Sequence, residues 1–178
     1  MVDWVSSFLS ERTCTLVFQV SPNFSSPVSV GSPQGSTICP LLFDFYVAPL
    51  HMSVPKGLMV SYIDDFSITV ASPSYRGNIR CIRKLFSTIS AKGQDIGLSF
   101  SVPKTELVHW RTPSQRSPPS TAPIMLEGQL SHPSPVVRWL GYWFTPALSS
   151  THHFMQGLSL AQTIFSCVKR LSSPRAGV

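Results

Sequence analysis

Much of the fold can be read from one segment, Val60-Ser61-Tyr62-Ile63-Asp64-Asp65-Phe66-Ser67-Ile68-Thr69-Val70. The runs on either side of the two aspartates, residues 58–63 and 66–71, are short, apolar and rich in β-branched side chains, as is typical of strands. Pro55 and Gly57 precede the first run, and Pro73 follows the second. The segment therefore predicts a β-hairpin with Asp64 and Asp65 where the chain reverses.

Two adjacent carboxylates at a tight turn suit nucleotide chemistry. Mg²⁺ takes oxygen ligands and is often shared between carboxylates and substrate phosphates. The alternative is a solvated loop, because Asp favours turns through its own hydrogen bonds. Taken alone, Asp64 and Asp65 leave both interpretations open.

Four further motifs accompany the aspartates in a fixed order. Upstream, Gly31-Ser32-Pro33-Gln34-Gly35-Ser36 forms a loop that runs into the apolar Pro40-Leu41-Leu42-Phe43. The others are Ser7-Phe8-Leu9-Ser10-Glu11-Arg12, Phe100-Ser101-Val102-Pro103-Lys104-Thr105-Glu106 and Trp139-Leu140-Gly141-Tyr142. In this order the five motifs resemble the reverse transcriptase of LINE-like (non-LTR) retrotransposons, of the kind common in fungal genomes. Five signatures in family order are far more specific than any one of them.

The resemblance implies an α+β fold. Residues 1–146 would form a partial polymerase palm, an antiparallel sheet with helices on one face. Residues 147–178 would begin a helical thumb or form a C-terminal tail. The activity implied is RNA-directed DNA polymerisation with two Mg²⁺ ions, an RNA template, a DNA primer and deoxynucleotide triphosphates.

The resemblance also implies residue roles. Asp64 matches the catalytic aspartate that binds metal directly, and Asp65 is its neighbour in the motif. Tyr62 matches a residue near the primer end and the nucleotide, and Lys104 a lysine near the triphosphate. The template and the nascent base pair would contact Pro33, Gln34, Gly35 and Ser36, and the primer would be gripped by the hairpin of Leu140 and Gly141.

Each of these assignments has a structural alternative. Ser36 and Gln34 can cap the following helix, Lys104 can be a solvated lysine, and residues 139–142 can be core strand. We interpret His152 and His153 as structural, because no third ligand is spaced for a metal.

The remaining segments predict a mixed succession of elements. Residues 74–92 place apolar side chains at helical spacing, with Arg76, Arg80, Arg83 and Lys84 on the opposite side. This basic stripe predicts either contact with nucleic-acid phosphates or a solvated helix face. In the first half of the chain the other expected elements are a helix at 2–9, strands at 13–18 and 28–30 around a turn-rich link at 21–26, and a helix that Ser36 caps, that runs to His51 and that Pro49 kinks or ends early. In the second half we expect strands at 98–101 and 107–110, a loop at 112–123 and a hairpin turning at Glu127-Gly128. A strand or strand pair at 136–144 and a helix capped by Thr151 that reaches Leu171 complete the chain.

Composition limits the remaining possibilities. The 178 residues suffice for one domain or part of a larger one, and the net charge of +6 suits a partner with phosphates. The four cysteines are too widely spaced for a zinc site or a disulfide framework. We expect no membrane span and no secretion leader, hence an intracellular protein, with nucleus and cytoplasm left open.

The departures from the family matter as much as the matches. The first catalytic carboxylate strand and the fingers would lie before the Ser7 motif, where the sequence has only six residues. Thr37, Cys39 and Pro49 are unusual at their positions, as expected of a decayed copy. Three hypotheses follow: an enzyme part that is inactive as an isolated chain, a non-catalytic nucleic-acid-binding remnant, or a gene-model fragment without function.

Overall fold

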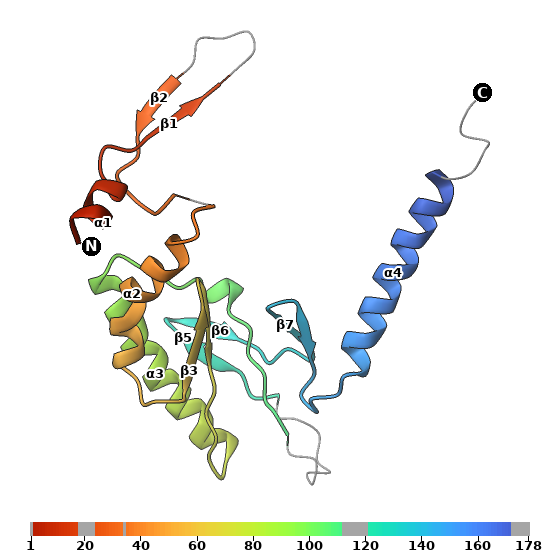
Figure 1. Cartoon of the computed structure of the whole chain (residues 1–178). Coiled ribbons are helices and arrows are strands. Elements are labelled where there is room, and N and C mark those ends of the chain that lie inside the picture. The colour runs from red at the N-terminus through yellow and green to blue at the C-terminus, as the bar shows by residue number, and fades with distance from the viewer. Residues whose placement is uncertain (1, 18–23, 34, 112–120, 172–178) are drawn as a thin grey trace. The chain divides into compact units, whose positions relative to one another are not determined.

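The computed structural model describes residues 2–17, 24–33, 35–111 and 121–171 (Figure 1). Within these residues the chain is mixed α and β, as predicted. The helices are α1 (Val2–Leu9), α2 (Cys39–Met52), α3 (Tyr75–Asp95) and α4 (Thr151–Leu171), with a short 3₁₀ helix, η1 (Val102–Lys104). The strands are β1 (Thr13–Leu16), β2 (Phe24–Pro27), β3 (Met59–Tyr62), β4 (Asp65–Ile68), β5 (Ile124–Leu126), β6 (Gln129–Ser131), β7 (Val137–Trp139) and β8 (Tyr142–Phe144).

The strands pair as four separate hairpins, β1–β2, β3–β4, β5–β6 and β7–β8. This differs from the single antiparallel sheet that the sequence predicted, although the pairs β1–β2, β5–β6 and β7–β8 are each antiparallel. The chain forms two compact units. Unit 1 comprises Met1–Pro49 and Ser61–Phe66, and unit 2 comprises Leu50–Val60 and Ser67–Val178.

In unit 1, β1 pairs with β2 rather than with the strand predicted at residues 28–30. The register runs from Thr13 opposite Pro27 to Leu16 opposite Phe24, and the Thr15 hydroxyl donates to Ser25 Oγ over 3.2 Å. Both strands are exposed along their whole length. Because neither face is buried, apolar alternation is not required, and a serine-rich segment that reads as a turn can form a strand.

Helix α2 begins at Cys39, so the prediction that Ser36 is its N-cap is wrong. The helix also does not end at Pro49. Pro40 lies in the first turn, where a missing N–H costs no helical bond. Pro49 lies in the last turn and removes the N–H that would donate to the Phe45 carbonyl, but the helix continues past it to Met52. The backbone N–H and the hydroxyl of Ser53 both donate to the Leu50 carbonyl and close the helix.

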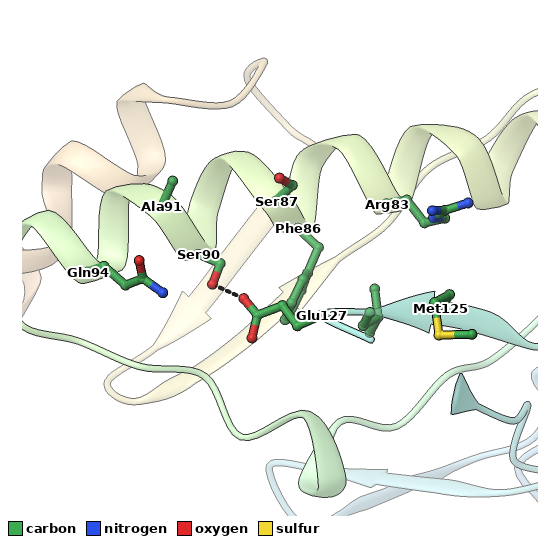
Figure 2. A pocket seen from close by; sticks show the side chains of 9 residues that line it. Arg83, Phe86, Ser87, Ser90, Ala91, Gln94, Met125 and Glu127 are labelled. Atoms are coloured by element: carbon green, nitrogen blue, oxygen red, sulfur yellow. Dashed lines mark hydrogen bonds between the residues drawn. The ribbon is translucent and has the colours of Figure 1, made fainter. Parts of the chain in front are cut away.

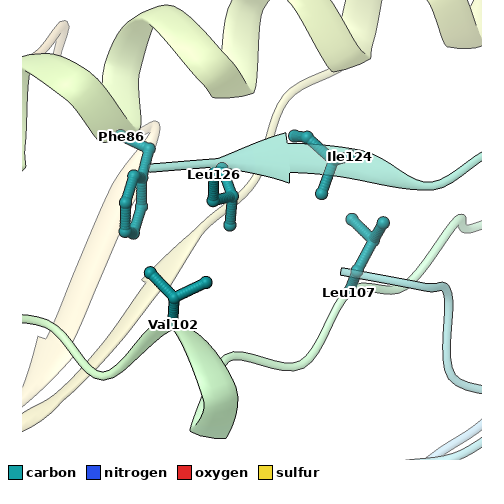
Figure 3. Close-up of a cluster of buried hydrophobic side chains, with 5 residues drawn as sticks. All are labelled: Phe86, Val102, Leu107, Ile124 and Leu126. Carbon is teal, nitrogen blue, oxygen red and sulfur yellow. The ribbon is translucent and has the colours of Figure 1, made fainter. Parts of the chain in front are cut away.

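The core of unit 2 forms around helix α3. Figure 3 shows its central cluster. The members are Phe86, Val102, Leu107, Ile124 and Leu126, with Ile79, Ile82 and Phe100 packed against them. Ser74 caps α3, because its hydroxyl accepts from the Gly77 N–H over 3.1 Å. The sequence predicted this helix and its basic face correctly.

The prediction of strands at residues 98–101 and 107–110 is wrong, because neither segment forms a strand. Val102 enters the core from the short helix η1, and Leu107 forms only an isolated bridge with Pro133. Pro103 lies between the two segments, in the first turn of η1, where its fixed φ and missing N–H are tolerated. Single apolar side chains inserted into a core can thus resemble strand residues in a sequence.

The C-terminal hairpins follow the prediction, and the last helix does too, except that it begins at Thr151, so Thr151 is not its N-cap. β5–β6 turns at Glu127 and Gly128, and residues 137–144 form the strand pair β7–β8. Helix α4 contacts β8 and, within its described span, has no buried residue. The loop predicted at 112–123 falls largely outside the described residues. Among the helices that are described, none combines the length and apolar character needed to cross a bilayer.

Candidate metal and nucleotide site

The hairpin of β3 and β4 presents both aspartates at its tip. Ile63 and Asp64 form the two-residue turn, and Asp65 is the first residue of β4. At the base of the hairpin the Thr69 N–H donates to the Leu58 carbonyl over 2.9 Å. Asp64 and Asp65 are both exposed. The predicted hairpin and its turn are therefore confirmed.

The turn carries backbone strain at Ile63, which has a φ of 54°. A two-residue hairpin turn commonly places a glycine where the first residue has positive φ. A β-branched side chain disfavours this region, at a cost of about 1–3 kcal/mol. Strain of this kind is often found at functional sites, and here it lies directly before the aspartate pair.

The donor set at the tip is two carboxylates. Hard oxygen ligands of this kind fit Mg²⁺, which usually binds through one or two carboxylates together with substrate oxygens and water. In the part of the chain that the structure describes, no cluster of three or more His, Cys, Asp or Glu side chains is arranged to hold a metal ion. The tip alone offers a partial ligand set, with Tyr62 beside it, 59% exposed.

The loop before α2 contains a tight turn. The Ser36 N–H donates to the Pro33 carbonyl over 3.4 Å, and Cys39 Sγ donates to the same carbonyl over 3.0 Å. Gly35 has a φ of 90°, so glycine is favoured there by the backbone conformation. No heavy atom of the described chain lies within 4 Å of a Cβ built on Gly35. Gln34 lies outside the described residues.

Lys104 ends η1 and is exposed. Its N–H donates to the Ser101 carbonyl over 3.1 Å, and the Thr105 N–H donates to Val102 over 3.0 Å. Val102 anchors this turn in the core, 6% exposed. The position of the lysine is therefore set by packing two residues away.

The β7–β8 hairpin turns at Leu140 and Gly141, with φ values of 50° and 85°. Its β8 strand carries an aromatic cluster that the sequence did not reveal. The Tyr142 ring stacks on His153 with centroids 5.0 Å apart, and Trp143 packs edge-on against His152 at 5.6 Å. The two histidines thus have a structural environment, attaching the first turn of α4 to β8.

The basic stripe of α3 is exposed at Arg76, Arg80, Arg83 and Lys84. Figure 2 shows Arg83 at one end of a pocket of about 380 Å³ between α3 and the β5–β6 turn. Ser90 and Glu127 also line this pocket, and the Ser90 hydroxyl donates to the Glu127 carboxylate. Glu127 has a φ of 45°. This contact, which sequence reasoning missed, links the strained turn to the helix.

The predicted site residues fall into the two units. The hairpin tip with Tyr62, Asp64 and Asp65 belongs to unit 1, together with the loop of Pro33, Gly35 and Ser36. Lys104, Leu140, Gly141 and the basic stripe belong to unit 2.

His109 is a buried polar residue that the sequence did not predict, and its Nε2 lies 2.8 Å from the Ala122 carbonyl oxygen. A histidine in an apolar run was the only signal for it.

Comparison with known proteins agrees with the motifs. The family model described as reverse transcriptase (RNA-dependent DNA polymerase) matches residues 1–144. A probable RNA-directed DNA polymerase from transposon BS of Drosophila melanogaster is 26% identical over 178 residues, covering 96% of this chain and 19% of that protein. No solved structure matches. Because the family model covers most of the chain, the protein belongs to the reverse transcriptase family.

Proposed function

We propose that the chain supplies part of the nucleotidyl-transfer site of an RNA-directed DNA polymerase from a LINE-like, non-LTR retrotransposon. The exposed aspartate pair at a strained hairpin tip, in a chain that matches the family over residues 1–144, is the observation that carries this proposal. Residues 1–146 would be part of the palm and residues 147–178 the start of the thumb. Such an enzyme acts inside the cell on RNA template, DNA primer and deoxynucleotide triphosphates.

Within this proposal each group has a physical task. Asp64 and Asp65 would hold Mg²⁺, which neutralises charge on the reacting phosphates when it is bound. Tyr62, exposed beside them, would contact the nucleotide or the primer end. The positive-φ turn at Gly35 leaves open space next to the backbone, where a template base can approach closely. Lys104 would offset negative charge on the triphosphate.

The remaining assignments concern the nucleic-acid strands. Leu140 and Gly141 would contact the primer from the tip of β7–β8. The exposed stripe of α3 would contact phosphates without reading sequence.

The isolated chain is expected to be inactive as a polymerase. Two Mg²⁺ ions, each with near-octahedral coordination, require more ligands than one turn supplies. The chain spans about a fifth of its transposon relative, so further ligands would come from other segments of a longer protein. We expect no primer extension by the chain alone with Mg²⁺ or Mn²⁺. Extension that is lost in Asp64→Ala would contradict this expectation.

The metal site can be tested without activity. Mn²⁺ replaces Mg²⁺ at oxygen sites and broadens nearby amide resonances, so titration of the chain should broaden residues 61–66 first, with a roughly millimolar midpoint. The Asp64→Asn/Asp65→Asn variant should lose this broadening. Asp95→Asn, which removes another exposed carboxylate, is the matched control and should keep it. Broadening that persists in the double variant would place the metal elsewhere and remove the basis of the proposal.

A further inference from the structure

The pocket between α3 and the β5–β6 turn combines polar and apolar groups. It has a volume of about 380 Å³, and Phe86, Ala91 and Met125 are among its apolar lining (Figure 2). Its polar lining consists of the side chains of Arg83, Ser87, Ser90, Gln94 and Glu127. All of the residues that line it belong to unit 2. Such a pocket suits a small ligand with a flat apolar body and polar edges.

Ser90 and Glu127 give the pocket a fixed acceptor. Ser90 is only 7% exposed, and its hydroxyl donates to Oε1 of Glu127. Glu127 itself is exposed, at the turn between β5 and β6. Because both oxygens of a carboxylate are acceptors, Oε2 is able to accept from an N–H group of a ligand. The contact with Ser90 therefore holds the carboxylate in place without using all of its capacity.

Arg83 belongs both to this pocket and to the basic stripe of α3. A polyanion that follows the stripe therefore reaches the pocket at Arg83. Between Arg83 and Ser90 the helix rises by about 10 Å. This is comparable to the length of a nucleotide from its phosphate to the far edge of its base, so one nucleotide can span the two polar ends.

We propose that the pocket binds one nucleotide of a single-stranded nucleic acid, with the phosphate at Arg83 and the edge of the base at Glu127. The base must be unpaired, because a base inside a duplex has its edge and its faces covered. The apolar lining contacts the faces of the base. This inference rests on the proposed function only in that the stripe of α3 contacts phosphates.

The carboxylate also selects among bases. An ionised carboxylate only accepts hydrogen bonds, so it favours a base with an exocyclic amino group, such as cytosine with its N4 amino group. Uracil has no amino group and presents the carbonyl oxygen O4 in that place. We therefore expect cytosine to be bound in preference to uracil.

A nucleotide fits this pocket better than an apolar segment of protein. Such a segment would remove water from Arg83, Gln94 and Glu127 without offering them a partner, which is costly for charged groups. A nucleotide supplies a phosphate for the guanidinium and an N–H donor for the carboxylate. The charges of the lining are thus matched at both ends of the pocket.

Fluorescence anisotropy with labelled ten-nucleotide oligo(C) and oligo(U) RNA tests the proposal. The chain should bind oligo(C) about tenfold more tightly, the effect of one hydrogen bond to a charged group. In Glu127→Gln the amide oxygen can still accept from Ser90, but the amide NH₂ then donates to the ligand and favours uracil. The preference should therefore vanish or reverse. Asp95→Asn, which removes a carboxylate of the same helix that does not line the pocket, is the matched control and should keep it.

A second variant separates the pocket from the stripe. Ser87→Phe fills the pocket from an exposed position of α3, so the helix content measured by circular dichroism should not change. It should abolish the preference for oligo(C) and leave the salt dependence of binding intact. Arg76→Gln/Arg80→Gln should do the opposite, weakening the binding of both RNAs by the same factor.

Three results would overturn the proposal. They are equal affinities of the wild-type chain for the two RNAs, a preference that survives in Glu127→Gln or in Ser87→Phe, and a chain that binds neither RNA. None of them affects the Mn²⁺ titration of residues 61–66, which tests the proposed function in unit 1. Failure of the pocket and failure of the metal site are therefore distinguishable.

Discussion

Helices α3 and α4 have the same length, 21 residues, and the same amphipathic character, but they differ in what covers them. α3 buries Leu85, Phe86 and Ile89, and Phe86 belongs to the central cluster of unit 2. α4, within its described span, buries nothing. An apolar stripe at helical spacing therefore marks a face that needs a partner, but it does not say whether the same chain provides that partner. The basic stripe differs too, since α3 carries it along its exposed side and α4 has cations only in its last turn.

The largest expected effect comes from matched phenylalanines. Phe86→Ala should lower the free energy of unfolding by about 3–5 kcal/mol, because it leaves a cavity in the central cluster. Phe165→Ala should change it by no more than about 0.5 kcal/mol at concentrations where the chain is monomeric. Urea denaturation measures both. Equal losses would mean that α4 is covered in the folded monomer and would end the contrast between the helices.

The charges of the two helices give the next effect. If the stripe of α3 contacts phosphates, Arg76→Gln/Arg80→Gln should reduce the slope of log affinity against log salt for RNA by about one to two units. Lys169→Gln/Arg170→Gln in α4 removes the same charge from a different helix and should reduce it by less. Fluorescence anisotropy across a salt series gives the slopes. Identical slopes for wild type and both variants would show that the stripe is only a solvated face.

The glycines of the two helices sharpen the comparison further. Gly93→Ala places a Cβ 3.1 Å from the Leu98 carbonyl oxygen and 3.1 Å from the Phe100 ring, so crowding offsets the gain in helix propensity. Gly157→Ala meets no described atom and should stabilise α4 by about 1 kcal/mol. Amide hydrogen exchange should slow about fivefold in α4 but not in α3. Equal slowing in both helices would show that Gly93 is not constrained by packing.

The smallest effect concerns the salt bridge of α3. Lys92 and Asp95 are 3.2 Å apart, with side chains 54% and 64% exposed. Lys92→Ala should therefore change stability by less than about 0.5 kcal/mol. If urea denaturation instead showed a loss of unfolding free energy close to that of Phe86→Ala, the pair would contribute more to stability than an exposed salt bridge can.

The hairpins illustrate why much of the fold was predictable. Gly128 and Gly141 supply positive φ at two-residue turns, and Ser74 supplies a side-chain cap, so each signal acts within a few residues. The hairpin tip of Asp64 and Asp65 is likewise a feature that neighbouring residues in the sequence predict. The prediction failed where the local signal was absent, as in the serine-rich strand β2, or ambiguous, as at residues 98–101.

The candidate site divides in the same way. The sequence alone located the aspartate pair, the turn at Gly35 and the exposed cations of α3. It did not indicate the strain at Ile63, the contact of Ser90 with Glu127 or the stacking of Tyr142 on His153. These features depend on backbone conformation or on residues that are distant in the chain. The roles proposed for the site residues stay predictions until they are tested.

What the sequence determined by itself was local: the family motifs, the turns, the helix periods and the position of the carboxylates. Turn geometry and helix periodicity follow from backbone sterics and short-range hydrogen bonds, which neighbouring residues encode. Only the tertiary structure decided that α3 has a buried face and α4 an open one, and that Val102 and Leu107 enter the core singly. Burial depends on which distant residues meet, because apolar surface is stabilised only where other apolar surface covers it.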